Sequence, residues 1–138
     1  MLIRSFILTI SIINAVSAFV CGILLIAAPD GSLMAAGELL IPIATFPLAH
    51  IFFQDLLWIG IAMLLVLCIP NTVAATLLIR RHALQYHAVI LANILVMTWC
   101  SFQFIYMFNW LAVIYFLLGL LMVLGALFLI RHADRTHF

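Results

Sequence analysis

The sequence predicts an all-α fold, an antiparallel bundle of four transmembrane helices in a single domain over residues 1–138. Of the 138 residues, 70% are hydrophobic and 7% are charged, whereas soluble domains are about half apolar and about a quarter charged. The mean hydropathy is +1.43. Four apolar runs each reach the length of about 20 residues that a helix needs to cross a hydrocarbon core about 30 Å thick. We therefore expect a polytopic membrane protein.

Turns and charged residues set the ends of the four runs. Pro29-Asp30-Gly31 ends the first run, Arg80-Arg81-His82 ends the second, and Asn109 lies in a tight hairpin between the third and the fourth. The second run is longer than a bilayer needs, so we expect it to tilt, to extend past the interface or to kink at Pro70. The predicted helices cover residues 5–28, 50–79, 84–108 and 110–130.

The basic residues all fall on one side of a chain that crosses the membrane four times. The opposite side carries Asp30 and Glu38 and neither lysine nor arginine. Because cytoplasmic loops carry an excess of arginine and lysine, we predict a protein of the inner cell membrane with both termini in the cytoplasm. The residues that set this orientation are Arg4, Arg80, Arg81, Arg131 and Arg135.

The predicted outer loop, residues 29–49, is too apolar for an ordinary solvated linker. Leucine, isoleucine and methionine are spread through it, and Pro42 and Pro47 interrupt any long helix. One interpretation is a plain connector that lies in the outer interface. The other is a lid over the bundle, since loops frequently carry function.

The net charge and the positions of the cysteines argue against a nucleic-acid partner and against several kinds of cysteine site. A formal net charge of +1 leaves no basic stripe that could neutralise a phosphate backbone, so we expect no nucleic-acid partner. Cys21, Cys68 and Cys100 lie inside apolar runs without CxxC spacing. We therefore expect no disulfide framework, no thiol-redox relay and no thiolate zinc site.

The histidines follow a repeated pattern, Arg81-His82-Ala83-x-x-x-His87 and Arg131-His132-Ala133-x-x-x-His137. The repeat fits a duplicated two-helix unit or a cytoplasmic metal site. However, a spacing of five residues does not stack two imidazoles on one helical face, and no histidine pair lies mid-membrane to hold a haem. We expect interfacial anchoring instead, with no metal and no cofactor.

Three stretches resemble small bacterial four-helix membrane proteins of the DoxX-like kind. They are residues 22–38 with Ala28-Pro29-Asp30-Gly31-Ser32-Leu33-Met34, then Trp99 followed by Gln103, then Trp110-Leu111 with Tyr115 and Gly119. The resemblance extends thinly over the whole chain and implies a four-helix bundle. The family name comes from a quinol-oxidising complex, but the resemblance implies no catalytic residue. His50, Gln54 and Asp55 depart from the family pattern, which is expected to be apolar there.

Small and polar residues mark the helix faces that pack together in lipid, because apolar surfaces gain nothing from leaving the lipid. Asn14 and Asn93 lie on such faces, roughly ten residues from the cytoplasmic boundary and so near the bilayer centre. We predict that the two side chains hydrogen-bond across the bundle. The pair is interpreted as structural glue, and an ion path is the alternative.

A second polar level is predicted in the outer half of the bundle, roughly five residues below the outer boundary. The polar side chains at this level would bind the polar end of a ligand. Two tryptophans just beneath, too deep for an interfacial aromatic belt, would hold its apolar body. The candidate ligand site consists of Gln54, Asp55, Trp58, Trp99, Gln103 and Tyr115.

Asp55 is the only acidic residue within a predicted spanning segment. Intramembrane carboxylates are costly and usually mark a function. Because desolvation disfavours the charged form, we expect a neutral carboxyl group that donates a hydrogen bond to a ligand carbonyl. The alternative is an interfacial aspartate that reaches the headgroups or bonds to Gln103.

These observations predict a membrane protein that binds a hydrophobic ligand, a quinone or a lipid, in a cavity of the outer leaflet. No catalysis is inferred from the residues. Two other interpretations stay open. One is a structural or accessory subunit of a larger membrane complex, in which the polar level only fixes helix packing. The other is a small transporter that self-associates.

Overall fold

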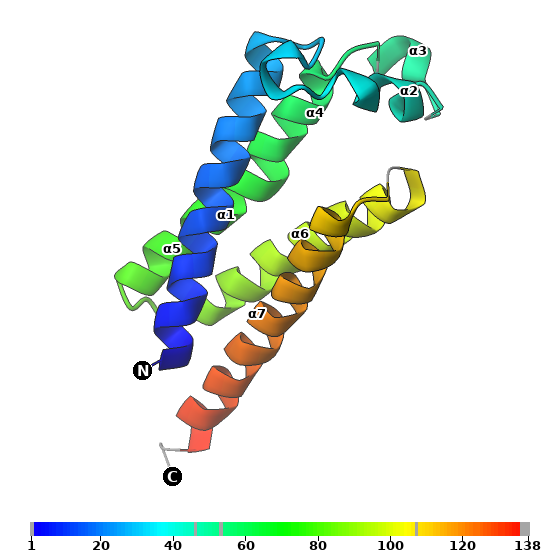
Figure 1. Cartoon of the computed structure of the whole chain (residues 1–138). Coiled ribbons are helices and arrows are strands. Elements are labelled where there is room, and N and C mark those ends of the chain that lie inside the picture. The colour runs from blue at the N-terminus through cyan, green and yellow to red at the C-terminus, as the bar shows by residue number, and fades with distance from the viewer. Residues whose placement is uncertain (1, 46, 53, 107, 136–138) are drawn as a thin grey trace.

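The computed structural model describes residues 2–45, 47–52, 54–106 and 108–135 and is drawn in Figure 1. Within these ranges the chain is helical throughout, with short turns and no strand. Four stretches are long and apolar enough to cross a membrane, which confirms the predicted all-α bundle of four spanning helices. The long helices are α1 (Leu2–Ala27), α6 (Gln85–Tyr106), α7 (Trp110–Arg135) and a composite second span of α4 (Leu57–Ala62), the π-helical η3 (Met63–Cys68) and α5 (Ile69–Ile79).

The spanning helices form two groups that diverge from one end of the molecule. Helix α1 packs along α4, η3 and α5, and α6 packs along α7. The groups meet mainly through α5 and α6, so they separate toward the end that carries α2 and α3 in Figure 1. We call that end the loop end. The N-terminal end of α1, the C-terminal end of α7 and the 80–84 turn lie at the opposite, arginine end.

A dry cluster closes the arginine end. Its members come from all four spans and are at most 1% exposed. Arg4 adds a link between two spans, because its guanidinium donates a hydrogen bond to the Leu78 carbonyl in the last turn of α5. A cation at a helix C-terminus also interacts favourably with the helix dipole. The cluster consists of Ile7, Ala74, Leu78, Val89, Ala92, Met122 and Ala126.

The structure corrects the predicted second helix, residues 50–79. A short helix, α3 (Ala49–Phe52), is followed by bends at residues 54–56, and the spanning helix begins at Leu57. The Asp55 carboxylate accepts the Leu57 N–H at 3.0 Å, and Gln54 Nε2 donates to the His50 carbonyl. Because aspartate side chains compete in this way with helical backbone bonds, Asp55 starts the spanning helix instead of lying inside it.

The expected distortion at Pro70 takes the form of a π-helical segment. Proline has no N–H to donate within the helix, and the six residues of η3 lie directly before Ile69 and Pro70. The Ile69 N–H bonds to the Leu64 carbonyl, five residues back. The Asn71 side chain donates to the Leu67 carbonyl at 2.8 Å. Segments of this kind bend helices and often lie at functional sites.

The long connection at the loop end, residues 28–56, folds back onto the spanning helices. It contains η1 (Ser32–Met34), η2 (Gly37–Leu39), α2 (Leu40–Ile43) and α3. Ile43, Ala49 and Leu56 are buried against Leu25 of α1, and Tyr106 of α6 packs against the same cluster. The connection therefore contacts both helix groups and covers the space where they diverge.

Backbone bonds fix the start of this connection. The Leu56 N–H donates to the Pro29 carbonyl at 2.8 Å, which joins its two ends. The Ser32 N–H donates to the Asp30 carboxylate at 3.0 Å. Hydrogen bonds from the Ser32 backbone and hydroxyl hold the pKa of the Asp30 carboxyl below its ordinary value. The turn between them has Gly31 at a φ of 77°, a conformation that suits glycine.

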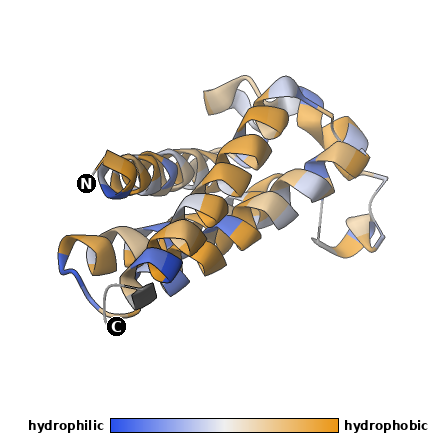
Figure 2. Ribbon diagram, turned by 90° about the horizontal axis from the view of Figure 1, so that it is seen from below, coloured by the Kyte–Doolittle hydropathy of each residue, from blue (hydrophilic) through white to orange (hydrophobic). Residues whose placement is uncertain are grey.

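The outward faces of the long helices are apolar, as Figure 2 shows from below the view of Figure 1. Large apolar side chains such as Ile13, Leu91 and Leu117 are about half exposed or more, at 47%, 60% and 58%. In a soluble protein such surface would form an unusually large apolar patch. On spanning helices it is the surface that meets lipid.

Candidate functional site

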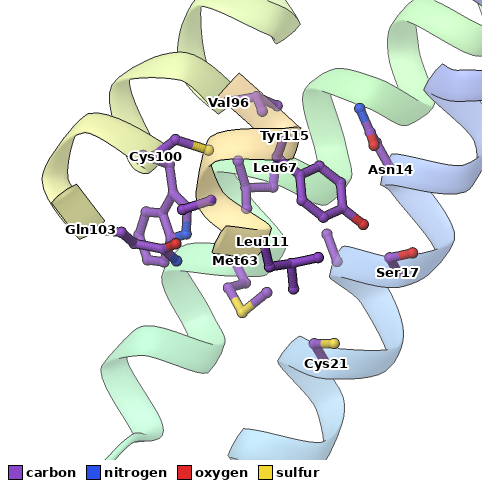
Figure 3. Close-up of a pocket in the computed structure, with 13 residues that line it drawn as sticks. Asn14, Ser17, Cys21, Met63, Leu67, Val96, Cys100, Gln103, Leu111 and Tyr115 are labelled. Carbon is purple, nitrogen blue, oxygen red and sulfur yellow. The ribbon is translucent and has the colours of Figure 1, made fainter. Parts of the chain in front are cut away.

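A pocket of about 160 Å³ lies between the two helix groups, from the middle of the bundle toward the loop end. Side chains from α1, η3, α6 and α7 line it, and Figure 3 shows ten of them labelled. Most of the lining is apolar, and no lining residue carries a charge. The pocket is thus a product of the divergence of the two groups in Figure 1.

The first wall of the pocket comes from α1. Asn14, Ser17, Ala18 and Cys21 follow one another at three- and four-residue spacing and face the pocket. Close backbone contact fixes this wall against α4 one turn further on. A Cβ atom added to Gly22 would lie 3.0 Å from the Gly60 carbonyl oxygen, closer than real Cβ contacts usually come. Small residues of this kind let spanning helices approach one another.

The opposite wall comes from α6 and α7. Trp99, Cys100 and Gln103 contribute from α6, and Tyr115 contributes from α7. In Figure 3 the Tyr115 hydroxyl points across the pocket toward Asn14 and Ser17, while Gln103 lies on the far side. The pocket therefore has polar groups at two facing walls with an apolar space between them.

Asn109 holds the hairpin between α6 and α7 and also positions Gln103. Its Oδ1 accepts the Ala112 N–H at 2.7 Å, which caps the first turn of α7. Its Nδ2 donates to Gln103 Oε1 at 3.4 Å. The Gln103 oxygen is thereby engaged, and the two N–H donors of its amide are left for the pocket.

The π-helical segment supplies the remaining side of the pocket through Met63 and Leu67. Met63 also packs against the buried cluster of the 28–56 connection. The connection therefore lies directly against the loop end of the pocket. Both interpretations of the predicted outer loop, a connector in the outer interface and a lid over the bundle, are compatible with this packing.

The structure brings together half of the predicted ligand site. Trp99, Gln103 and Tyr115 line the pocket, because regular helices joined by a short hairpin keep the depths that counting assigns. Gln54, Asp55 and Trp58 do not line it. The first two stand in the break before α4, and Trp58 is 45% exposed in the first turn of that helix.

Several lining residues were not among the predicted ligand contacts. Asn14 was assigned only to helix packing. Ser17 and Cys21 share its three- and four-residue spacing on α1, and this spacing was the available signal. The sequence gives no such signal for Met63 and Leu67, because a π-helical turn changes the direction in which both side chains point.

The predicted hydrogen bond between Asn14 and Asn93 is not found among the described residues. Asn93 Nδ2 donates instead to the Val89 carbonyl of its own helix at 2.9 Å, and Asn93 Oδ1 has no partner there. Asn14 is 7% exposed and lines the pocket. Asn14 thus lines the pocket and Asn93 does not, because α1 and α6 diverge above the cluster at the arginine end.

The lining of the pocket is uncharged. It offers amides, hydroxyls, thiols and an indole, and neither a carboxylate nor a histidine that could transfer protons at neutral pH. Among the described residues, no group of three or more histidine, cysteine or acidic side chains could hold a metal ion. His137, part of the repeated histidine pattern, lies outside them.

The chain matches no model of a protein family, no curated protein and no solved structure. The functional argument therefore rests on the pocket and on the four apolar spans.

Proposed function

We propose that this protein binds a hydrophobic ligand in the pocket between its two helix groups, and that the ligand is a quinone ring or part of a lipid. The observation that supports the proposal most directly is the pocket of about 160 Å³ lined by all four spans. By the positive-inside rule the loop end would face outward, so the pocket would lie in the outer leaflet of the inner membrane.

Size limits what part of a ligand the pocket holds. A cavity of about 150 Å³ accommodates one benzene molecule, so the pocket has room for one six-membered ring or a short piece of acyl chain. The rest of a quinone or lipid would extend between the diverging helix groups into the bilayer. A whole lipid does not fit.

Polarity favours a ring with acceptors on two sides. Gln103 presents amide N–H groups at one end of the wall formed by α6 and α7, and the Tyr115 hydroxyl of the same wall points away from Gln103, toward α1. A 1,4-quinone has carbonyl oxygens at opposite ends of its ring, and Gln103 and Tyr115 would each donate to one of them.

The test uses the fluorescence of Trp99 as the reporter. Trp58→Phe and Trp110→Phe leave Trp99 as the single tryptophan of the chain, and a short-chain 1,4-benzoquinone serves as the quenching probe in detergent micelles. Binding in the pocket is expected to give saturable quenching. Quenching that rises linearly with the probe concentration, like that of free tryptophan in the same micelles, would contradict the proposal.

Two conservative substitutions test the proposed donors. Tyr115→Phe and Gln103→Leu preserve most of the shape and each remove one hydrogen-bonding group. We expect each to weaken the binding of the probe by roughly fivefold, which corresponds to about 1 kcal/mol for a hydrogen bond. Neither Trp58 nor Trp110 lines the pocket, and the two side chains are 45% and 75% exposed. Unchanged binding in both variants would contradict the assignment of the two donors. Loss of saturable quenching from the parent, together with a stoichiometric protein partner after purification, would support the accessory-subunit interpretation.

A further inference from the structure

A second cavity lies on the outside of the bundle at the arginine end, between the start of α1 and the middle of α7. It is an open groove of about 330 Å³, lined only by apolar side chains and a glycine. It shares no lining residue with the pocket between the two helix groups. The groove is lined by Leu2, Ile3, Phe6, Ile7, Leu121 and Gly125.

Gly125 keeps the groove open on the α7 side. A Cβ atom added at this position would lie 3.5 Å from side-chain carbons of Ile3 and Ile7, so no α7 side chain occupies this part of the groove. Ile7 is 1% exposed and belongs to the dry cluster, which separates the groove from the interior of the bundle. Phe6 and Leu121 are 42% and 53% exposed. In a membrane, lipid or another protein would cover such a surface.

The groove leads toward basic side chains of α7. Phe128 and His132 follow Gly125 at steps of three and four residues, so they lie on the same face of the helix. The His132 ring stacks on the Phe128 ring, with the centroids 5.8 Å apart and the planes 13° apart. His132 and the neighbouring Arg131 are both exposed. The apolar face of α7 therefore ends in two side chains that can donate hydrogen bonds.

These basic side chains lie just beyond the end of the groove. Gly125 lies against Ile3 in the first turn of α1, and Arg131 is about 9 Å further along the axis of α7. In Figure 1, α7 extends past the N-terminal end of α1 at the arginine end. The apolar groove and the basic side chains thus follow one another in the same order as the acyl chain and the phosphate of a phospholipid.

The charge at this end favours a lipid over a second copy of the chain as the occupant. The sequence places all five arginines there with one acidic residue, Asp134. Copies that share one orientation in the membrane would bring these positive ends together at the same level, and like charges oppose such contact. An anionic phosphate at the membrane surface is complementary to them, because basic residues near the surface attract anionic lipids.

We propose that the groove binds one acyl chain of an anionic phospholipid, whose phosphate accepts hydrogen bonds from Arg131 and His132. The groove has about twice the space of a cavity that holds one benzene molecule, which suits a segment of one chain. The guanidinium offers several N–H donors and a neutral imidazole offers one. This site goes beyond the proposed ligand pocket, because it uses other residues at the opposite end of the bundle.

Short-range quenching of tryptophan fluorescence by brominated lipids tests the site. The three native tryptophans are replaced by phenylalanine, and one tryptophan is placed in the groove, by Phe6→Trp in one protein and by Leu121→Trp in another. Leu91→Trp, at a position 60% exposed near the arginine end of α6, is the control outside the groove. Each protein is reconstituted in phosphatidylcholine vesicles with a fixed fraction of dibrominated phosphatidylglycerol or dibrominated phosphatidylcholine.

We expect the preference for brominated phosphatidylglycerol to be about fivefold greater at each groove position than at Leu91→Trp, which is the contribution of one basic residue near a membrane surface. Arg131→Gln should remove this difference. Arg80→Gln, which removes the same charge at an exposed position after α5, should preserve it.

Three results would overturn the site. An equal preference at Leu91→Trp and in the groove, or an equal effect of the two arginine substitutions, would show that only the general positive charge of this end attracts the lipid. A groove tryptophan that neither brominated lipid quenches would show that protein covers the groove. Two groove positions are used so that poor folding of one variant does not decide the result. Quinone binding in the pocket is independent of every one of these outcomes, so the two proposals fail separately.

Discussion

At the scale of single residues, Arg81 shows how the second span ends. Its φ is 52°, in the left-handed region. Its N–H bonds to the Leu78 carbonyl at 3.2 Å, and the His82 N–H bonds to the Leu77 carbonyl at 3.0 Å. This is the pair of bonds that closes many helices, and glycine is the usual residue in the left-handed position.

Arg81→Gly is therefore expected to stabilise the protein. Removing the Cβ relieves a conformational cost of about 1 kcal/mol, and the free energy of unfolding in mixed micelles measures the gain. Arg80→Gly is the matched control, since it removes the same charge at a residue with an ordinary φ of −75°. That control should lose up to about 1 kcal/mol. Equal effects of the two substitutions would contradict the assignment.

Residue-level prediction from the sequence succeeds where a residue lies in a regular helix. The depths of Trp99, Gln103 and Tyr115 could be counted from the hairpin between α6 and α7, and the three residues do share the pocket. Asp55 could not be placed in this way. Its bond to the Leu57 N–H and the Leu56–Pro29 backbone bond depend on the folded connection, which the apolar pattern does not reveal.

At the scale of elements, the composite second span gives the pocket part of its shape. The sequence identifies Pro70 as the site of a distortion, because proline lacks a backbone donor. The sequence does not indicate whether the helix kinks or forms a π-helical turn at this proline. In the structure the distortion is the π-helical segment η3, and two of its residues, Met63 and Leu67, line the pocket.

Pro70→Ala tests this link between element and pocket. The new N–H group allows regular α-helical bonding, which would rotate the residues before it by about 100°, one residue's share of a turn. We expect a more stable protein, by up to about 3 kcal/mol, that has lost saturable quenching of Trp99 by the benzoquinone probe. Pro42→Ala, in α2 and outside the pocket lining, should keep the quenching. A more stable Pro70→Ala variant that keeps saturable quenching of Trp99 would contradict the role of η3 in shaping the pocket.

At the scale of the whole molecule, the four spans follow from the sequence and the divergence of the two helix groups does not. Length and hydropathy alone define each span. The angle between the groups depends on where close contacts form, such as Gly22 against Gly60 and Gly119 against Met97. These contacts occur within each group, whereas the dry cluster holds the groups together only at the arginine end.

If the chain crosses the membrane four times, the 28–56 connection and the turn after α5 face opposite sides of the membrane. In a chain without native cysteines, Ser32→Cys reports on the 28–56 connection and His82→Cys reports on the turn after α5, and both positions are exposed. An impermeant thiol reagent added to intact cells should label Ser32→Cys alone. His82→Cys should react only after the membrane is permeabilised, since the positive-inside rule predicts that the arginine end faces the cytoplasm. Labelling of both in intact cells would refute this topology.

The most direct test of the central claim, that the pocket binds a hydrophobic ligand, is to fill it. Val96 lines the pocket and is 5% exposed, whereas Ile94 is 48% exposed on the same helix. A phenylalanine ring at position 96 would occupy much of a space that fits about one benzene molecule. Mass spectrometry of quinones and lipids extracted from the purified parent, Val96→Phe and Ile94→Phe proteins is the measurement. We expect the parent and Ile94→Phe to retain the same molecule in stoichiometric amount and Val96→Phe to lose it. Equal retention by all three proteins, each folded, would show that the pocket is not the binding site.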